Sequence, residues 1–256
     1  MKIVILGRGN VGTNLHHAFE QKGINAELRS ARDVVAARKV SGLEVRGLEG
    51  ADVIIYAIAD NALRDVVAAV NAPKALHLHT SGSMPIDVFG SDKPHAGVLY
   101  FFQSFSKARL IDDWSGIPVF IEGRNIDDVA AIYTLAQTLS SRIYECTQRD
   151  RERLHVAGVF ANNFSNLMFR MAADILRDTQ IPFAALLPLI DQTAEKIHTM
   201  TPKDAQTGPA QRGDENVMNH HLEVLNQAVC GAGFTAQEKS EVYKLLSKLI
   251  CQKTEK

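Results

Sequence analysis

The sequence predicts an α/β protein, with a doubly wound parallel sheet in residues 1–146 followed by an all-α domain in residues 147–256. Three observations support this fold class. A glycine-rich turn lies between an apolar strand and a helix at the amino terminus. Strand and helix patterns then alternate as far as Glu145, as expected for parallel strands joined by crossover helices. From Thr147 onward only helical periodicity remains, so the domain boundary is placed there.

The glycine-rich turn follows a buried strand over residues 2–6 and precedes a helix over residues 13–22, and its sequence matches G-x-G-x-x-G. In this motif the first glycine permits a sharp turn, the second lets the main chain approach a pyrophosphate, and the third lets helix and strand pack closely. The helix start offers free N–H groups to phosphates. The alternative is a turn that only connects two elements. We predict a Rossmann domain that binds a dinucleotide through Gly7, Arg8, Gly9, Asn10, Val11 and Gly12.

The end of the second predicted strand, residues 25–29, should select between the two nicotinamide dinucleotides. An acid there would bind a free ribose 2′-OH, whereas arginine and a small hydroxyl suit a 2′-phosphate. Arg29, Ser30 and Arg32 lie at this end, which favours NADP and makes them candidate cofactor ligands. Glu27 shares a face with Arg29 and keeps NAD open. The two arginines could also be solvated surface charges.

Small and polar residues follow the next two predicted strands, over residues 52–58 and 75–80, which are separated by a helix over residues 62–70. Ligands of doubly wound sheets lie beyond the carboxyl ends of the strands. Each of these residues alone could be a simple turn former. Together they are expected to ring the cofactor cleft and to leave room for a nicotinamide ring. They are Ala59, Asp60, Thr80, Ser81 and Gly82.

The rest of the first domain is predicted to contain strands over residues 95–102, 117–122 and 142–145 and a helix over residues 126–139. His77 and His79 alternate onto one face of their strand, but no cysteine or acid at ligand spacing accompanies them. We interpret both as structural histidines and predict no metal site.

The first carboxyl-terminal helix is predicted to be long, over about residues 148–179. At 100° per residue, Asn162 and Asn166 lie within about 20° of His155, so three polar side chains share one narrow stripe among apolar residues. Buried amides and imidazoles without hydrogen bonds cost about 1–3 kcal/mol each. A substrate pocket facing the nicotinamide would supply partners. A structural network between helices, or simple exposure, would account for the stripe as well.

A second helix over residues 182–200 is predicted to precede the longest irregular stretch, residues 201–214. Arg212 in this stretch could clamp a substrate carboxylate, and Asp214 is interpreted as the N-cap of the next helix. The last two helices are predicted over residues 216–230 and 236–251, separated by residues 231–233. Apolar positions on them suit either an intrachain core or a dimer seam, namely Val242, Leu245, Leu246, Leu249 and Ile250.

Composition excludes several classes of function. A formal net charge of -1, with 46% hydrophobic and 22% charged residues, is typical of a soluble globular protein and provides no electrostatic argument for nucleic acid or an acidic membrane as partner. Cys146, Cys230 and Cys251 are too scattered for a disulfide framework. The first strand begins at Lys2 and leaves no room for a signal peptide, and the longest apolar runs are too short for a bilayer, so we expect a cytoplasmic protein.

These motifs together resemble one family, the NADP oxidoreductases with a Rossmann half and a helical carboxyl-terminal domain of unknown function. The segments that carry the resemblance are residues 7–12, 79–83, 102–107, 155 with 162–164, and 207–214. More distantly, the plan is similar to pyrroline-5-carboxylate reductase, deazaflavin-dependent NADP reductase, ketopantoate reductase and the β-hydroxyacid dehydrogenases. The resemblance implies a helical domain that forms a homodimer and helps to close the active site.

One departure from the β-hydroxyacid dehydrogenases affects the expected chemistry. Those enzymes use a lysine four residues before an asparagine on the first long helix of the second domain, where this chain has His155 and Val159. We therefore expect His155 to be the general acid, since histidine titrates near neutral pH, with Asn162 or Asn166 orienting the substrate. Further candidate substrate ligands are Gln103, Ser104, Asn163, Thr207 and Arg212.

The predicted function is NADP-dependent hydride transfer to or from a small oxo acid, hydroxy acid or imine. Two alternatives remain at this stage. The chain could bind NADP without turnover, as a redox sensor or partner-binding protein, because a fold does not guarantee a function. A methyltransferase that binds S-adenosylmethionine is less favoured, because such enzymes normally carry an acid at the end of the second strand. An enzyme should have a polar pocket that contains His155, whereas a sensor should have an exposed apolar patch.

Overall fold

The computed structural model describes residues 1–41, 48, 50–227 and 233–251. The chain forms two compact units, Met1–Asn162 and Asn163–Lys256. Helices replace strands at Gln148, where α5 (Gln148–Gly158) begins, and α5 belongs to the first unit. Three predictions lie outside the described residues, namely the end of the helix predicted over 216–230, Cys230, and Gly231 with Ala232 of the following turn.

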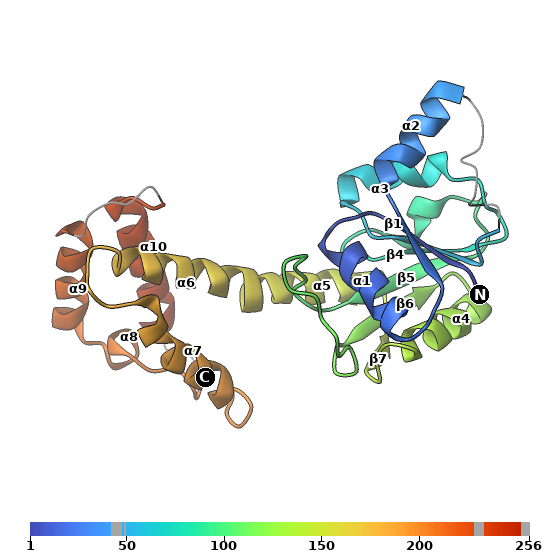
Figure 1. The fold of residues 1–256 in the computed structure, drawn as a ribbon. Coiled ribbons are helices and arrows are strands. Elements are labelled where there is room, and N and C mark those ends of the chain that lie inside the picture. The colour runs from blue at the N-terminus through green and yellow to red at the C-terminus, as the bar shows by residue number, and fades with distance from the viewer. Residues whose placement is uncertain (42–47, 49, 228–232, 252–256) are drawn as a thin grey trace. The chain divides into compact units, whose positions relative to one another are not determined.

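The first unit is built on a seven-stranded sheet in the order β2-β1-β3-β4-β5-β6-β7 (Figure 1). Its strands are β1 (Ile3–Leu6), β2 (Ala26–Arg29), β3 (Val53–Tyr56), β4 (Leu76–His79), β5 (Ala96–Phe101), β6 (Val119–Gly123) and β7 (Ile143–Glu145). Because β1 pairs in parallel with both β2 and β3, the strand order reverses between β1 and β3. Ligand sites of doubly wound sheets lie at this reversal. The predicted α/β class is confirmed.

The sheet departs from the predicted parallel arrangement at one strand pair, because β6 runs antiparallel to β5. Since β7 is parallel to β6, both of these strands run opposite to β1–β5. Parallel neighbours need a crossover that carries the chain back to the starting edge of the sheet. The segment between β5 and β6, residues 102–118, contains no helix that could make this crossover, and the chain returns directly. The apolar residues of β5 and β6 indicate that both strands are buried, but they do not indicate the direction in which each strand runs.

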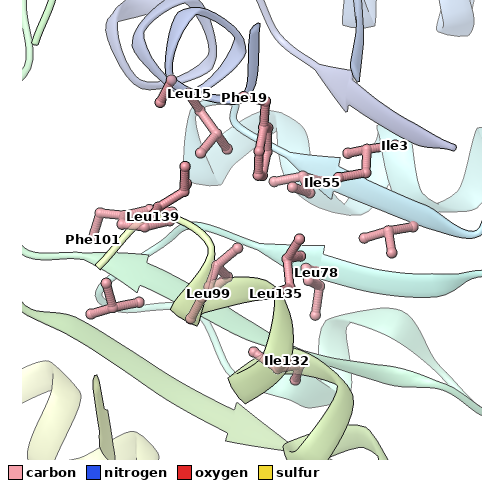
Figure 2. Packing of buried hydrophobic residues seen from close by; sticks show 14 of the residues in the cluster. Ile3, Leu15, Phe19, Ile55, Leu78, Leu99, Phe101, Ile132, Leu135 and Leu139 are labelled. Carbon is pink, nitrogen blue, oxygen red and sulfur yellow. The ribbon is translucent and has the colours of Figure 1, made fainter. Parts of the chain in front are cut away.

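Helices cover both faces of the sheet, as expected from the continuous apolar runs. One face packs on α1 (Asn10–Gln21) and α4 (Ile126–Gln137), and Figure 2 shows Leu15 and Phe19 of α1 and Ile132 of α4 with the strand residues of this core. The opposite face packs on α2 (Ala31–Ser41), α3 (Asp60–Ala69) and η1 (Ile86–Phe89). Successive residues of β1 alternate between the two cores, because side chains alternate along a strand.

The helix predicted over residues 148–179 is observed over residues 148–175. It consists of α5, a π-helix η2 (Val159–Phe164) and α6 (Ser165–Ile175), which follow one another without an intervening residue. A π-turn closes with i→i+5 hydrogen bonds, so each residue advances by less than 100° around the axis. The stripe predicted for His155, Asn162 and Asn166 assumed α-helical geometry throughout. That spacing argument does not hold across η2, and the roles of the two asparagines toward a substrate stay predictions.

The second unit is helical. Its other elements are η3 (Phe183–Leu186), α7 (Leu187–Lys196), α8 (Pro209–Arg212), α9 (Glu215–Gln227) and α10 (Ala236–Cys251). The helix predicted over residues 182–200 is divided between the 3-10 helix η3 and α7. The N-cap predicted at Asp214 is confirmed, because its Oδ1 accepts a hydrogen bond from the Val217 N–H at 3.2 Å. A buried ion pair of 2.8 Å joins Asp174 of α6 to Lys239 of α10. Within the described residues, we find no helix with the length and apolar character needed to cross a bilayer.

Candidate functional site

The glycine-rich turn between β1 and α1 has the geometry that its motif predicts. Gly7 adopts φ 124°, and a Cβ at this residue would overlap with the carbonyl oxygen of Ala57. A Cβ at Gly12 would overlap with the carbonyl oxygen of Gly7, so α1 packs directly against the turn. At Gly9, in contrast, the nearest atom to a Cβ would be the Ala57 oxygen at 3.9 Å. The turn and packing roles of Gly7 and Gly12 are confirmed, while Gly9 keeps an open side.

A cleft of about 950 Å³ lies where the strand order reverses, beyond the carboxyl ends of β1, β3 and β4. This volume is at the upper end of the range for ligand pockets. Predicted site residues that line the cleft are Gly7, Arg8, Gly9, Asn10, Val11, Ser30, Arg32, Ala59, Asp60, Thr80, Ser81, Gly82, Gln103 and His155. It is also lined by residues without a predicted role, including Tyr100, Phe105 and Lys107.

The end of β2 divides the predicted cofactor-selecting residues into two groups. Arg29 donates to both carboxylate oxygens of Glu27, from Nε at 2.6 Å and from a terminal nitrogen at 3.0 Å. This hydrogen bonding holds the pKa of the Glu27 carboxyl below its usual value. Arg29 is not among the residues that line the cleft, whereas Ser30 and Arg32 are. The carboxylate of Glu27 is thus hydrogen-bonded to Arg29. At this end of the cleft, Ser30 contributes a hydroxyl and Arg32 contributes a positive charge.

His155 contacts two elements of the sheet. Its Nδ1 lies 2.9 Å from the hydroxyl oxygen of Tyr100 on β5, and the two rings meet edge-on with centroids 6.0 Å apart. A Cβ at Gly82, in the turn after β4, would lie 2.6 Å from the same nitrogen, so only glycine leaves room for the ring. Burial raises the pKa of Tyr100 to about 12, which keeps its hydroxyl protonated at neutral pH. Tyr100 and Gly82 therefore fix the position of His155 in the cleft.

Arg151, one turn before His155 on α5, anchors the helix to the sheet. Its side chain is fully buried, pairs with Glu122 of β6 and donates to the Met84 carbonyl oxygen at 2.6 Å. Met84 follows the Ser81–Gly82 turn that lines the cleft. Burial, with a further contribution from the Arg151 charge, lowers the pKa of His79 to about 3. Arg151 thereby links α5 to the turn against which His155 packs.

His77 and His79 are buried in the sheet, as their interpretation as structural histidines requires. For His77 this interpretation is confirmed, because Nδ1 lies 2.9 Å from the Tyr56 hydroxyl and Nε2 lies 2.9 Å from the Ala72 carbonyl oxygen. His79 accepts a hydrogen bond at Nδ1 from the Ser81 N–H at 3.2 Å. Burial lowers the pKa of His77 to about 4. Both rings are therefore neutral near pH 7.

Comparison with known proteins identifies the family. The family model described as "Domain of unknown function (DUF2520)" matches residues 117–250, more than half of the chain. The crystal structure of a "putative NADP oxidoreductase" from Bacteroides fragilis is 36% identical, covers 98% of each chain and has a TM-score of 0.81. The chain belongs to this family. No match was found among curated proteins.

More distant structures share the fold of this family member. A protein from Thermotoga maritima is 17% identical, covers 98% of this chain and 100% of its own, and has a TM-score of 0.72. An imine reductase from Myxococcus stipitatus in complex with NADP+ is 13% identical, covers 97% of this chain and 95% of its own, and has a TM-score of 0.63. At these identities the likeness shows the fold alone.

Several predicted site residues are not among those that line the cleft. Ser104 follows the lining residue Gln103 in sequence, and the Ser104 N–H donates to the Gln103 side-chain oxygen at 2.7 Å. Asn162 belongs to η2, at the end of the first unit. Asn163, Asn166, Thr207 and Arg212 belong to the second unit, so their roles toward substrate stay predictions.

Tyr100, Arg151 and Lys107 are the residues that sequence reasoning missed in this family member. Tyr100 lies in an apolar strand and is indistinguishable there from a core aromatic residue. Arg151 lies in a charged helix start that has the composition of a solvated surface. Lys107 lies in a loop segment that carried part of the family resemblance, which is the one signal that could have drawn attention to it.

Proposed function

We propose that this protein is an NADP-dependent oxidoreductase that transfers a hydride between the nicotinamide and a small oxo acid, hydroxy acid or imine. The observation that carries the proposal is a single cleft that contains both the open side of the glycine-rich turn and His155. The family relationship to an NADP oxidoreductase supports the cofactor. A polar pair of His155 and Tyr100 in the cleft is what an enzyme requires and a silent sensor does not.

The residues of the cleft fit a dinucleotide. Gly9 leaves the main chain of the turn open to a pyrophosphate, since a Cβ there would meet no described protein atom closer than 3.9 Å. The first turn of α1 contains no acidic residue, and no described side chain caps it, so its N–H groups can bind an anion. Arg8, Arg32 and Lys107 add positive charge to the lining. When bound, the cofactor supplies the hydride.

The end of β2 favours NADP over NAD. In an NAD site, a carboxylate at this strand end accepts hydrogen bonds from the ribose 2′-OH. Here the acid on β2, Glu27, is bound on both oxygens by Arg29. Ser30 and Arg32 line the cleft and can donate to a 2′-phosphate. Arg29 acts in this proposal mainly by neutralising Glu27.

His155 acts as the general acid in the direction of reduction. In the imidazolium form both ring nitrogens carry protons, and Nδ1–H donates to the Tyr100 oxygen. The proton on Nε2 passes to the substrate oxygen or nitrogen as the neighbouring carbon gains its hydride. Nδ1–H still donates to the Tyr100 oxygen afterwards, so this contact orients the ring in both charge states. Asn162 or Asn166 orients the substrate, with Gln103, Ser104, Asn163, Thr207 and Arg212 as its further ligands.

The test starts with binding and ends with chemistry. Titration with NADPH and NADH, followed by the thermal midpoint of unfolding, should show that the folded protein is stabilised by about 2.7 kcal/mol at a hundred times Kd. NADPH should reach this stabilisation at a lower concentration than NADH. Small oxo acids and imines are then screened for oxidation of NADPH. With a substrate in hand, His155→Gln should lower kcat at least about 100-fold and leave the NADPH affinity unchanged, whereas exposed His198→Gln should alter neither. Binding of neither dinucleotide, or full activity of His155→Gln, would refute the proposal.

We further propose that the chain forms a homodimer through the helical unit. This unit exposes large apolar side chains, including Leu189 at 66%, Leu245 at 57% and Leu249 at 52%. Exposed apolar surface of this extent is typical of protein interfaces. A second, mainly apolar cleft of about 370 Å³ lies between α6, α9 and α10.

Sedimentation equilibrium tests the homodimer. The wild-type protein should sediment as a dimer, and Leu245→Glu should shift it toward monomer because a charge would be buried in the interface. The neighbouring Lys244→Glu changes charge on the same helix and should have a smaller effect. A monomeric wild-type protein at micromolar concentration would contradict the proposal.

A further inference from the structure

The segment after β5 is fastened to the helix that begins at the glycine-rich turn. Asn14 of α1 is fully buried, and its amide nitrogen donates to the Ser106 carbonyl oxygen at 3.0 Å. The N–H of Ile111 donates to the Asn14 side-chain oxygen at 3.0 Å. The N–H of Lys107 donates to the side-chain oxygen of Asn10 at 3.2 Å. Two asparagines one helical turn apart therefore hold this segment along α1.

Aromatic packing holds the same segment from the other side. Phe105 stacks on Trp114 at a centroid distance of 5.2 Å, and Trp114 meets Phe101 of β5 edge-on at 4.9 Å. The indole N–H of Trp114 donates to the Ile111 carbonyl oxygen at 2.9 Å. The loop after β5 is thus attached to both the sheet and α1. These contacts are all within the chain, so they hold the loop in place without a bound ligand.

This path brings a cation to the start of α1. Asn10 is the first residue of α1, and Lys107 hydrogen-bonds to it through its main chain. Lys107 lines the same cleft as Gly9 and Asn10. Its side chain is exposed, and its ammonium group forms no ion pair with any residue that the structure describes. Arg109, two residues along the loop, does not line the cleft.

We propose that Lys107 is a phosphate ligand of the cofactor, specific for the pyrophosphate and held in place by Asn10 and Asn14. The inference rests on the proposed NADP-binding function. In a doubly wound sheet the pyrophosphate lies at the amino terminus of the first helix, where Lys107 is tethered. A 2′-phosphate lies instead at the end of β2, where Ser30 and Arg32 line the cleft. An ammonium group on a flexible stem can follow a phosphate, and its charge adds to that of the helix N–H groups.

Substitutions at Lys107 and at Arg32 should affect the binding of the two dinucleotides differently. NADPH and NADH share the pyrophosphate and differ in the 2′-phosphate. Lys107→Met should raise the Kd of NADPH and of NADH by the same factor, about tenfold for one charge-assisted contact, and leave their ratio unchanged. Arg32→Met should raise the Kd of NADPH alone. Arg109→Met removes the same charge from the same loop and should change neither Kd by more than about twofold.

Isothermal titration of the full-length protein with NADPH and NADH at low ionic strength provides the measurement, and added salt should reduce the effect of Lys107→Met. An unchanged NADPH affinity in Lys107→Met, or an equal loss in Arg109→Met, would overturn the inference and leave the proposed function intact. A loss confined to NADPH would overturn the assignment to the pyrophosphate. Binding of neither dinucleotide by the wild-type protein would overturn the proposed function, and the inference with it.

Discussion

Two buried histidines should make the first unit sensitive to mild acid. Burial lowers the pKa of His77 to about 4, and burial with the Arg151 charge lowers the pKa of His79 to about 3. The unfolded chain binds these protons with a pKa of about 6.5. The folded state therefore binds fewer protons below pH 6.5. The stability that the neutral rings contribute is complete above that value and is lost as the pH falls toward the folded pKa values.

The size of the loss follows from the two pairs of pKa values. Between pH 7 and pH 5 the unfolded state gains nearly one proton at each histidine, and the folded state gains almost none. Linkage then predicts a loss of about 2 kcal/mol for each histidine over this range, or about 4 kcal/mol for both. Carboxylates contribute little in this interval because their unfolded pKa values lie near 4.

Urea unfolding at several pH values measures this loss. The single tryptophan, Trp114, is buried in the first unit, so its fluorescence reports on that unit alone. His77→Gln should reduce the fall in unfolding free energy between pH 7 and pH 5 by about half. His220→Gln removes a histidine whose side chain is 72% exposed and should leave the fall unchanged. A His77→Gln protein with the wild-type pH dependence would refute the reasoning.

Three further predictions concern the site. Gly12→Ala should lower the free energy of unfolding by about 3 kcal/mol or more, because the new Cβ meets a main-chain oxygen, while Gly116→Ala, with open space around it, should be nearly neutral in urea unfolding. Arg151→Met should lower the free energy of unfolding by about 3–5 kcal/mol because Glu122 loses its buried partner, and Glu122→Gln in the same protein should restore part of this free energy. A loss below about 1 kcal/mol in Arg151→Met would contradict the role of the pair. Tyr100→Phe should keep the fold but change the nitrogen NMR shifts of the His155 ring, and unchanged shifts would show that Tyr100 does not hydrogen-bond to the ring.

The sequence alone predicted most of the Rossmann unit because burial leaves a direct trace in composition. The interior strands were recognised from their apolar runs, and every predicted strand end lies within two residues of the observed one. The direction of β6 and β7 and the π-helix η2 were missed for a different reason. Strand direction depends on how the intervening loop returns, and a π-turn changes the hydrogen-bond register without requiring an unusual residue. Neither property is encoded in periodicity.

Within the site, the same contrast separates Gly7 and Gly12 from the residues that position the ring of His155. Gly7 and Gly12 are recognisable because their steric requirement arises from neighbours in the same strand–turn–helix unit and from one adjacent strand. Tyr100, Gly82 and Arg151 act across elements that are distant in the chain, and Arg151 reaches Glu122 and Met84 from a helix that looks solvated in sequence. A charged residue can be buried only when another element supplies its partner. The contacts that position His155 are therefore recognisable only after the fold has brought those elements together.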